Sequence, residues 1–166
     1  MFGVNDTVAY SSNGICRITE IRKQKSGKNM VEFFVLKPVY NEGSTIFVPV
    51  NNQLLTSRMR RTLSREEVMD LISGLPAAGE LWPENESERQ ASFKTILQSG
   101  NQENILRIIK SLHCHARRCT AAGRKFRVSD ERILKEAENI LYEEFAYALG
   151  ISKDQVALLV QNELPV

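Results

Sequence analysis

The sequence predicts an α+β fold in which a small five-stranded antiparallel β-barrel is followed by an all-α domain of about five helices. In residues 1–60, short β-branched and aromatic runs are separated by Gly, Asn and Ser clusters, a pattern typical of strands and turns. From Leu63 onward, apolar residues recur at helical spacing. The chain has 166 residues, 42% of them hydrophobic and 25% charged, enough for one ordinary domain or two small ones. We therefore expect two domains, residues 1–61 and 62–166.

Four strand patterns precede the boundary. "DTVAY" alternates towards Val8 and Tyr10, and "GICRITEIRKQ" alternates through Ile15, Arg17, Thr19 and Ile21. "MVEFFVLKPVY" and "STIFVPV" are rich in β-branched and aromatic residues, and "SSNG", "KSGKN" and "NEGS" supply the turns. A final short strand near "QLLTS" would complete five. Short strands at this spacing favour a barrel, which protects its edges by closure.

Five helices are expected after the boundary. The first begins at a capping box, Ser64 with Glu67, and the last at another, Ser152 with Gln155. Between them lie "SERQASFKTILQSG", "NQENILRIIKSLHCHARRC" and "SDERILKEAENILYEEFAYALG", and "LPAAGELWPENE" links the first helix to the second. The helical period predicts these core residues: Val68, Leu71, Ile72, Phe93, Ile96, Leu97, Ile105, Ile108, Ile109, Leu112, Ala116, Ile133, Ala137, Ile140, Leu141, Phe145 and Ala148.

Charge is distributed in blocks, although the net charge is only +2. Residues 1–61 hold nine basic and four acidic side chains, and residues 62–88 hold one and seven. Residues 89–127 hold nine basic side chains against Glu103 alone, and residues 128–166 are again acidic. The basic block between two acidic ones favours a site for an anionic partner.

The stretch "HCHARRCTAAGRKFR", residues 113–127, allows two interpretations. Structural zinc needs four converging ligands, but successive helical residues point about 100° apart, so only His115 and Cys119 could share a face. We therefore expect no metal. The cations Arg117, Arg118, Arg124 and Lys125 suit phosphate groups, as do Arg89 and Lys94 on the preceding helix. The alternative is that they compensate a helix dipole beside a solvated loop.

No motif in the sequence indicates catalysis or disulfide bonding. Three Cys do not form a disulfide framework, and no Gly-rich phosphate loop, nucleophile motif or purposeful acid pair is present. We expect a non-enzyme that needs no cofactor and no small-molecule substrate. The opening "MFGVNDTVAY" lacks a signal-peptide pattern and no run of 18 apolar residues occurs, so we expect a cytoplasmic protein without a membrane partner.

Taken together, these motifs resemble the bacterial CarD family of transcription regulators over almost the whole chain. "VNDTVAYSSNGICRITEI" is similar to the opening of that family, with Asn5 in place of its usual Gly. "EFFVLKP" and "STIFVPVNN" resemble the third and fourth strands, and "RMRRTLS" resembles the segment that leaves the barrel. "RQASFKTILQSGN" and "RIIKSL" resemble the helical domain. The order and spacing of these motifs make the match specific.

The resemblance implies a Tudor/SH3-like domain that binds the RNA polymerase β subunit, and a helical domain that contacts double-stranded promoter DNA and helps the open complex to persist. It implies a DNA wedge at Trp82; packing of Trp82 on the helical core is the alternative. It also places the polymerase contact on the following residues: Lys23, Gln24, Ile46, Phe47, Val48 and Pro49. Phe47 favours an apolar docking patch if its side chain is exposed, and a core position if it is not.

Other functions stay open at this stage. An adaptor could bind a protein through the barrel without binding DNA, and a polymerase-binding module could act in transcription-coupled repair. A thiol sensor could use Cys114 and Cys119, although a bridge between them would distort their helix. Salt-dependent binding of duplex DNA would separate the regulator from the adaptor.

Overall fold

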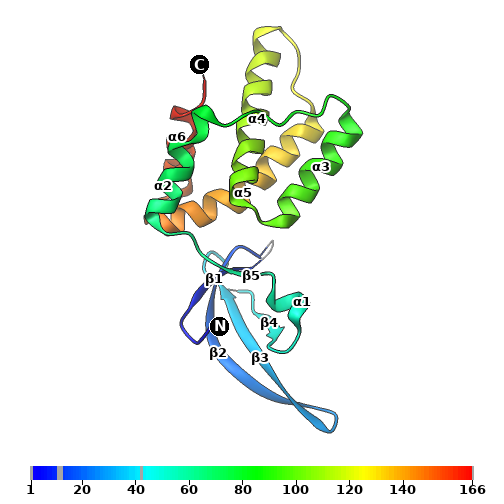
Figure 1. Ribbon diagram of the computed structural model, residues 1–166, viewed down its shortest axis with the longest axis vertical. Helices are drawn as coiled ribbons and strands as arrows, with labels where there is room; N and C mark the ends of the chain where they lie inside the picture. Colours follow the sequence, from blue (N-terminus) through cyan, green and yellow to red (C-terminus); the bar gives the residue numbers. More distant parts are fainter. Residues whose placement is uncertain (1, 11–12, 42, 166) are drawn as a thin grey trace. The chain divides into compact units, whose positions relative to one another are not determined.

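The described strands all lie in the first part of the chain, and the helices follow them except for one short helix before the last strand (Figure 1). The computed structural model describes residues 2–10, 13–41 and 43–165, and the chain divides into two compact units, Met1–Thr62 and Leu63–Val166. The division falls where the hydrophobic period changes from that of strands to that of helices. Residues 11, 12 and 42, which belong to the predicted turns "SSNG" and "NEGS", lie outside the described residues.

The first unit is a five-stranded antiparallel sheet with the order β4-β3-β2-β1-β5. Its strands are β1 (Thr7–Tyr10), β2 (Ile15–Ser26), β3 (Asn29–Pro38), β4 (Ile46–Pro49) and β5 (Met59–Arg61). A bulge between Ile18 and Glu20 shifts the register of β2 against β3, which bends the strand and increases its twist. In the pairings of the described residues β4 and β5 are both edges, so the expected barrel is a sheet that does not close.

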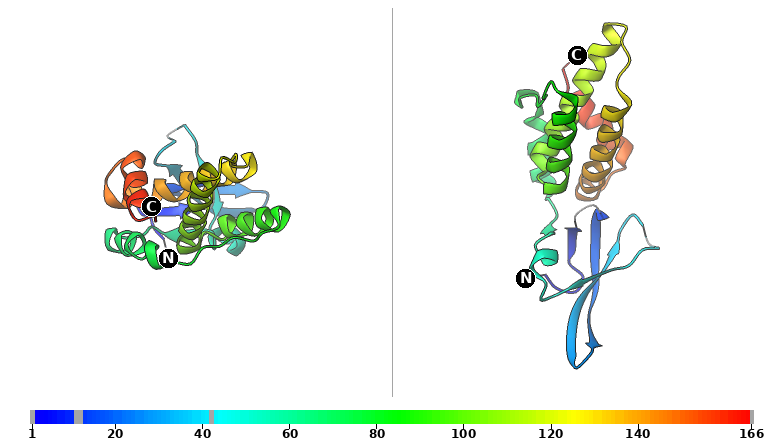
Figure 2. Two further views of the ribbon diagram at one scale, coloured as in Figure 1. Left: turned by 90° about the horizontal axis from the view of Figure 1, so that it is seen from above. Right: turned by 90° about the vertical axis from the view of Figure 1, so that its right-hand side faces the viewer.

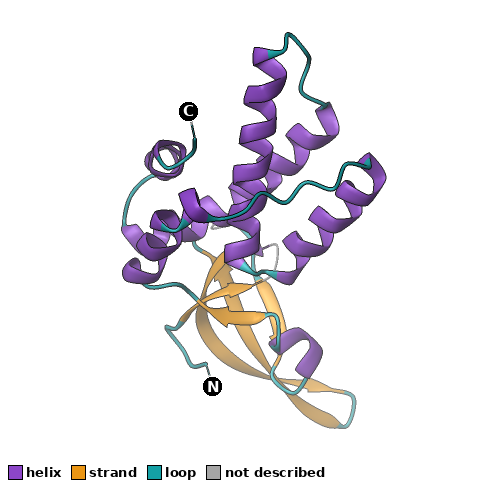
Figure 3. Ribbon diagram, turned by 45° about the horizontal axis from the view of Figure 1, so that its top comes forward, coloured by secondary structure: helices purple, strands orange, loops and turns teal. Residues whose placement is uncertain are grey.

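The position of the fifth strand differs from the prediction. Residues "QLLT" form a short helix, α1 (Gln53–Thr56), and the strand follows it as β5 (Figure 3). The side chain of Asn52 accepts a hydrogen bond from the backbone N–H of Leu55, which starts the helical turn. The prediction of a strand at "QLLTS" is therefore wrong by a few residues.

One face of the sheet carries the core of the first unit. Directly opposite residues lie on the same face, so Phe34 of β3 is beside Val48 of β4, and Leu36 is beside Ile46. The buried members of this core are Val8, Tyr10, Cys16, Ile18, Phe34, Leu36, Val48 and Met59.

The second unit contains five α-helices and one 3-10 turn among its described residues. They are α2 (Arg65–Ser73), η2 (Leu75–Ala77), α3 (Glu86–Ser99), α4 (Gln102–Ala121), α5 (Val128–Leu149) and α6 (Lys153–Asn162) (Figures 1 and 2). The predicted caps act as expected at α2 and α6: Ser64 accepts from the N–H of Glu67, and Ser152 and Gln155 bond reciprocally. No helix of the described residues is long and apolar enough to span a membrane.

The helical core forms where the apolar stripes predicted it, except that Ala116 is not part of it. Phe93, Ile108, Leu112 and Phe145 are among its fully buried side chains, and Leu71, Ile96 and Ala148 pack at its margin. The core clusters of the two units share no residue, so each unit buries its own apolar surface.

Candidate nucleic-acid and polymerase interfaces

The segment between η2 and α3 crosses α4, and α4 side chains hold it in place (Figure 3). The buried Lys110 donates hydrogen bonds from Nζ to the carbonyl oxygens of Leu75, Pro76 and Ala78 at 2.9, 3.2 and 2.6 Å. These bonds satisfy the ammonium group and three carbonyls at the end of η2. The role of Lys110 could not be predicted from the sequence, because its partners are more than 30 residues away.

Two more side chains of the same helix fix the following residues. The Arg107 Nε donates to the Gly79 carbonyl at 3.1 Å, and the Ser111 hydroxyl accepts from the Leu81 N–H at 2.8 Å. Residues spaced three or four apart on a helix share a face. We name residues 78–85 the strap; the strap delivers Trp82 to the side of α4.

Trp82 is half-buried and surrounded by aromatic and cationic side chains. Its ring is nearly parallel to that of His115, with centroids 4.0 Å apart, and meets Phe93 edge-on at 6.2 Å. The guanidinium carbon of Arg89 lies 4.4 Å from the Trp82 ring centroid. Packing of Trp82 on the helical core is therefore what the structure shows, and insertion of this ring between bases would require the stack to open.

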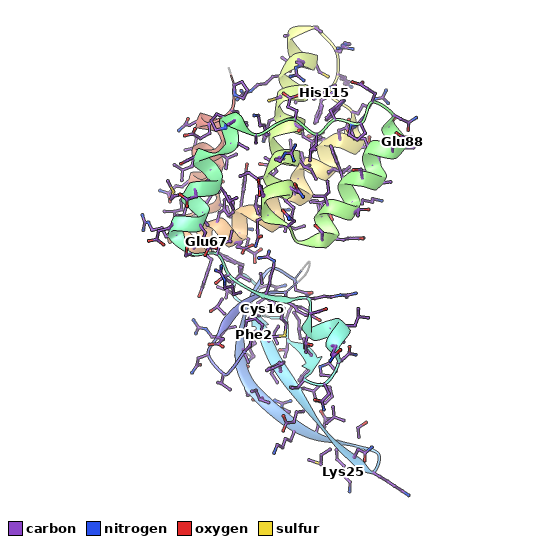
Figure 4. The ribbon with its side chains drawn as sticks, viewed as in Figure 1. Phe2, Cys16, Lys25, Glu67, Glu88 and His115 are labelled. Atoms are coloured by element: carbon purple, nitrogen blue, oxygen red, sulfur yellow. The ribbon has the colours of Figure 1, made fainter. Side chains whose placement is uncertain are left out.

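The surroundings of His115 in this stack favour its neutral form. Burial lowers the pKa of His115; the negative charge of Asp130 opposes this shift, whereas Arg89, Arg118 and Arg124 reinforce it. The neutral form is favoured, and it stacks on Trp82 without adding a charge to the apolar ring. Figure 4 places His115 on α4 where the strap crosses it.

Arg89 is an internal residue. Its Nε and Nη2 each donate to one carboxylate oxygen of Asp130 at 3.0 Å, and its Nη1 donates to the carbonyls of Pro83 and Glu84. The side chain is 4% exposed, so its donors do not face solvent. This burial corrects the assignment of Arg89 to a surface grip on phosphate: the residue ties the strap, α3 and α5 together.

A hollow in the surface of the second unit lies beside the stack. Of the cations at this hollow, Arg124 and Lys125 are exposed, and no carboxylate of the described residues lies within 4.0 Å of either. The hollow is lined by Trp82, Glu84, Glu86, Arg89, His115, Cys119, Arg124, Lys125 and Arg127. The loop between α4 and α5 therefore carries two uncompensated cations next to an aromatic wall.

The remaining predicted cations are placed differently. Arg118 forms a bidentate pair with Glu80 of the strap at 2.8 and 3.1 Å, which lowers the pKa of that carboxyl. Arg117 donates to the carbonyl of Pro165. Lys94 is exposed on α3 without an acidic partner among the described residues. Arg117 and Arg118 are thus partly used within the unit, whereas Lys94 is available.

The His and Cys side chains point to separate neighbours. His113 lies 3.8 Å from Glu138, whereas His115 stacks on Trp82. Across residues 2–10, 13–41 and 43–165, no three His, Cys, Asp or Glu side chains converge as metal ligands would. Burial and the nearby Glu80 raise the pKa of the Cys114 thiol, which suppresses the reactive thiolate and does not favour a thiol sensor.

In the first unit, the structure places Phe47 on the outer face of β4. Its side chain is 48% exposed, so the core alternative is wrong. Phe47 lies opposite Val35, Pro49 lies opposite Phe33, and the Arg22 guanidinium carbon is 5.6 Å from the Phe47 ring centroid. We name Arg22, Phe33, Phe47 and Pro49 the aromatic patch.

Of the other residues predicted to bind polymerase, Pro49 and Gln24 share this face with Phe47, whereas Ile46, Val48 and Lys23 do not. Val48 is fully buried and can offer a partner only its backbone, and Ile46 packs against the same core. Gln24 lies on the face of the patch, whereas Lys23 pairs with Glu32 on the opposite face. Arg22 and Phe33 were missed by the sequence analysis because the face of a strand depends on its register.

Comparison with known families supports the organisation just described. The family model described as CarD-like/TRCF RID domain matches residues 2–63, and the one described as CarD, C-terminal domain matches residues 54–161. The second match alone covers more than half of the chain. The chain belongs to the CarD family. This membership confirms the resemblance seen in the sequence, although no curated protein matches the chain.

Membership of the CarD family relates the hollow and the aromatic patch to transcription. The protein is an RNA polymerase-interacting, transcription-related protein, and the CarD family consists of non-enzymatic transcription factors. The aromatic patch lies within the matched RID domain, and the hollow lies within the matched C-terminal domain.

Proposed function

We propose that the protein is a transcription regulator whose first unit binds the β subunit of RNA polymerase and whose second unit binds promoter DNA, in the cytoplasm of a bacterial cell. A chain that binds both at once makes the second contact intramolecular, with a high effective concentration. The protein therefore stabilises the form of the promoter complex in which polymerase and DNA are better placed to contact both units. Through this preference the protein modulates the stability of the open complex.

The proposed DNA contact rests on one observation, the exposure of Arg124 and Lys125. Both are exposed beside the hollow, on a turn between two long helices, and neither is neutralised by a described carboxylate. Contacts of this kind go to phosphates and do not read sequence. Lys94 adds a third available cation. Trp82 supports the wall of the interface, and the exposed Arg118 pair can exchange Glu80 for a phosphate at low cost because such pairs are weak.

Replacing Arg124 and Lys125 together with Gln tests this proposal. Each lost phosphate contact makes the slope of log affinity against log salt shallower by about 0.9. We expect weaker binding to every duplex and a slope reduced by about one to two units. Gln at Arg117 and Arg118 is expected to have a smaller effect, since both are partly used internally.

A matched control removes two cations elsewhere in the second unit. Arg65 and Lys135 are exposed on α2 and α5, and their double Gln variant changes the net charge equally. We expect it to keep the wild-type slope. If the Arg124 and Lys125 variant also keeps affinity and slope, the loop is a solvated helix end, and the adaptor function, which needs no DNA, takes precedence.

The polymerase contact is supported by the aromatic patch and by the edge strand beneath it. β4 pairs only with β3 among the described strands, so its outer edge can pair with a strand of a partner. Aromatic residues and Arg are enriched where protein interfaces gain most of their binding energy. Phe47 and Arg22 therefore form the centre of the proposed contact with the β subunit.

Phe47→Ser tests this contact in a pull-down with the β subunit. Because Phe47 is half-exposed, we expect the fold to survive and the affinity to fall at least tenfold, as for a typical interface hot spot. Val4→Ser is the control, since Val4 has the same exposed fraction in the same unit. Equal retention of both variants on the β subunit would contradict the proposed surface. A role in transcription-coupled repair would instead show as polymerase binding without an effect on open complexes.

A further inference from the structure

The β2–β3 hairpin extends beyond the rest of its sheet. The pairs from Gln24–Val31 to Ser26–Asn29 join only β2 and β3, because β1 pairs with β2 no further than Arg17 and the last backbone bond from the β4 side runs from the Val50 N–H to the Glu32 carbonyl. We name residues 23–32 the ribbon. Figure 4 shows Lys25 near its end, and Figure 2 shows the ribbon projecting from the sheet.

The ribbon is exposed and basic. Every residue from 21 to 30 is exposed, and no acidic side chain lies between Glu20 and Glu32. Lys23 pairs with Glu32 at 3.6 Å, but no carboxylate of the described residues lies within 4.0 Å of Lys25 or Lys28. Gln24, Ser26 and Asn29 add neutral hydrogen-bonding groups.

The ribbon ends in a tight turn at Gly27 and Lys28. Gly27 has a φ of +65°, whereas Lys28 is not among the described non-Gly residues with positive φ. A two-residue turn with positive φ only at its first central position is of type II′, which matches the twist of the paired strands. The turn therefore holds Lys25 and Lys28 at the end of a twisted two-stranded ribbon.

This composition distinguishes the ribbon from the aromatic patch on the same unit. Protein interfaces are enriched in aromatic residues and depleted of Lys, and the ribbon from Lys23 to Met30 has three Lys and no aromatic residue. The phosphate backbone of DNA attracts such cations, and the major groove is wide enough to admit a two-stranded β-ribbon. Charge and shape thus both fit duplex DNA at the end of the ribbon, at Lys25 and Lys28, beyond the predicted polymerase contacts Lys23 and Gln24.

We propose that the ribbon is a second DNA-binding element, located on the polymerase-binding unit and separate from the loop at Arg124 and Lys125. Lys25 and Lys28 contact phosphates, and the narrow ribbon lies in or along a groove. The inference is independent of the DNA contact proposed for the second unit, since it rests on other residues.

The test uses the full-length chain, a labelled duplex of random sequence and a titration of salt. For Lys25→Gln with Lys28→Gln, we expect weaker binding and a salt slope shallower by about 0.9 for each lost contact. The Arg pair at the same positions should keep the slope, because the charges remain. Arg17→Gln with Lys37→Gln, two exposed and directly opposed residues of the same sheet, should also keep it.

The outcomes separate this inference from the proposed function. An unchanged slope for the Lys25 and Lys28 variant, with a reduced slope for the Arg124 and Lys125 variant, overturns the ribbon and leaves the second-unit interface intact. The converse result supports the ribbon alone. An equal loss with the Arg17 and Lys37 control indicates a general field of charge and overturns the ribbon contact. Loss of β-subunit binding without loss of DNA binding makes the ribbon a protein contact and also overturns it.

Discussion

At the scale of single residues, the Arg89–Asp130 pair connects the strap to the helices. It is the least exposed ion pair among the described residues, with side chains 4% and 0% exposed. Its partners are 41 residues apart, and the sequence alone suggests that Arg89 is a phosphate ligand. A long-range pairing of two charges leaves no periodic signal, so sequence reasoning could not identify it.

Removal of one partner should destabilise the second unit strongly. For Asp130→Ala we expect a loss of about 3–5 kcal/mol in the free energy of unfolding, because the guanidinium of Arg89 is left buried without its counter-charge. Urea titrations followed by fluorescence of Trp82, the only Trp in the chain, measure this value. Glu131→Ala is the control, since Glu131 is an exposed neighbour whose pair with Lys135 is worth little. A loss below about 1 kcal/mol for Asp130→Ala would mean that the pair is not structural.

His115 should make stability depend on pH. Its folded-state pKa lies below the unfolded value, so between the two the unfolded chain binds more protons and stability rises with pH. The stabilising contribution is present above the unfolded pKa of about 6.5 and is lost as pH falls through the folded pKa. His115→Phe keeps an aromatic partner for Trp82 and should remove this part of the acid sensitivity. His113→Gln should retain it, and identical pH profiles for wild type and His115→Phe would contradict the assignment.

At the scale of secondary structure, the period of the sequence predicted most elements and their buried faces. The hairpin turn at "KSGKN", the caps at Ser64 and Ser152 and the apolar stripe of α4 are local signals, and each is found where it was expected. The strap was expected only as a linker. Its conformation depends on hydrogen bonds that Lys110 and Arg107 donate and that Ser111 accepts, which local patterns do not encode. The exposed face of β4 could not be assigned from the sequence for another reason, since it depends on the register of the strand.

Lys110→Met should loosen the strap without emptying the core. Met fills much of the same volume, but the carbonyls of Pro76 and Ala78 lose the Lys110 donor, and that of Leu75 keeps only the Ala78 N–H. Leaving buried carbonyls unsatisfied costs about 1–3 kcal/mol. We expect this loss in urea unfolding, together with faster proteolysis within residues 75–85. Lys94→Met, at an exposed position of α3, should change stability by less than about 0.5 kcal/mol. Equal stability of the two variants would show that the strap does not need its anchor.

At the scale of the whole molecule, the division between the two units also divides the proposed interfaces. The two family matches overlap only over residues 54–63, which include β5 and the end of the first unit at Thr62. The aromatic patch and the ribbon lie before this boundary, and the loop at Arg124 and Lys125 lies after it. Separate cores on either side mean that each interface is supported by its own unit.

We therefore predict that the units fold and bind separately. The fragment 1–62 should keep the circular dichroism of a β-sheet and still bind the β subunit, because its apolar core contains no residue of the second unit. Its stability should be low, since a chain of about 60 residues buries a smaller fraction of its surface than a larger domain does. The fragment 63–166 should keep its helices, bind duplex DNA with a salt-dependent affinity and fail to bind the β subunit. The informative result is the folding of 1–62. If this fragment is unfolded in conditions where the whole chain is stable, the sheet depends on the helical unit, and polymerase binding cannot be assigned to the sheet alone.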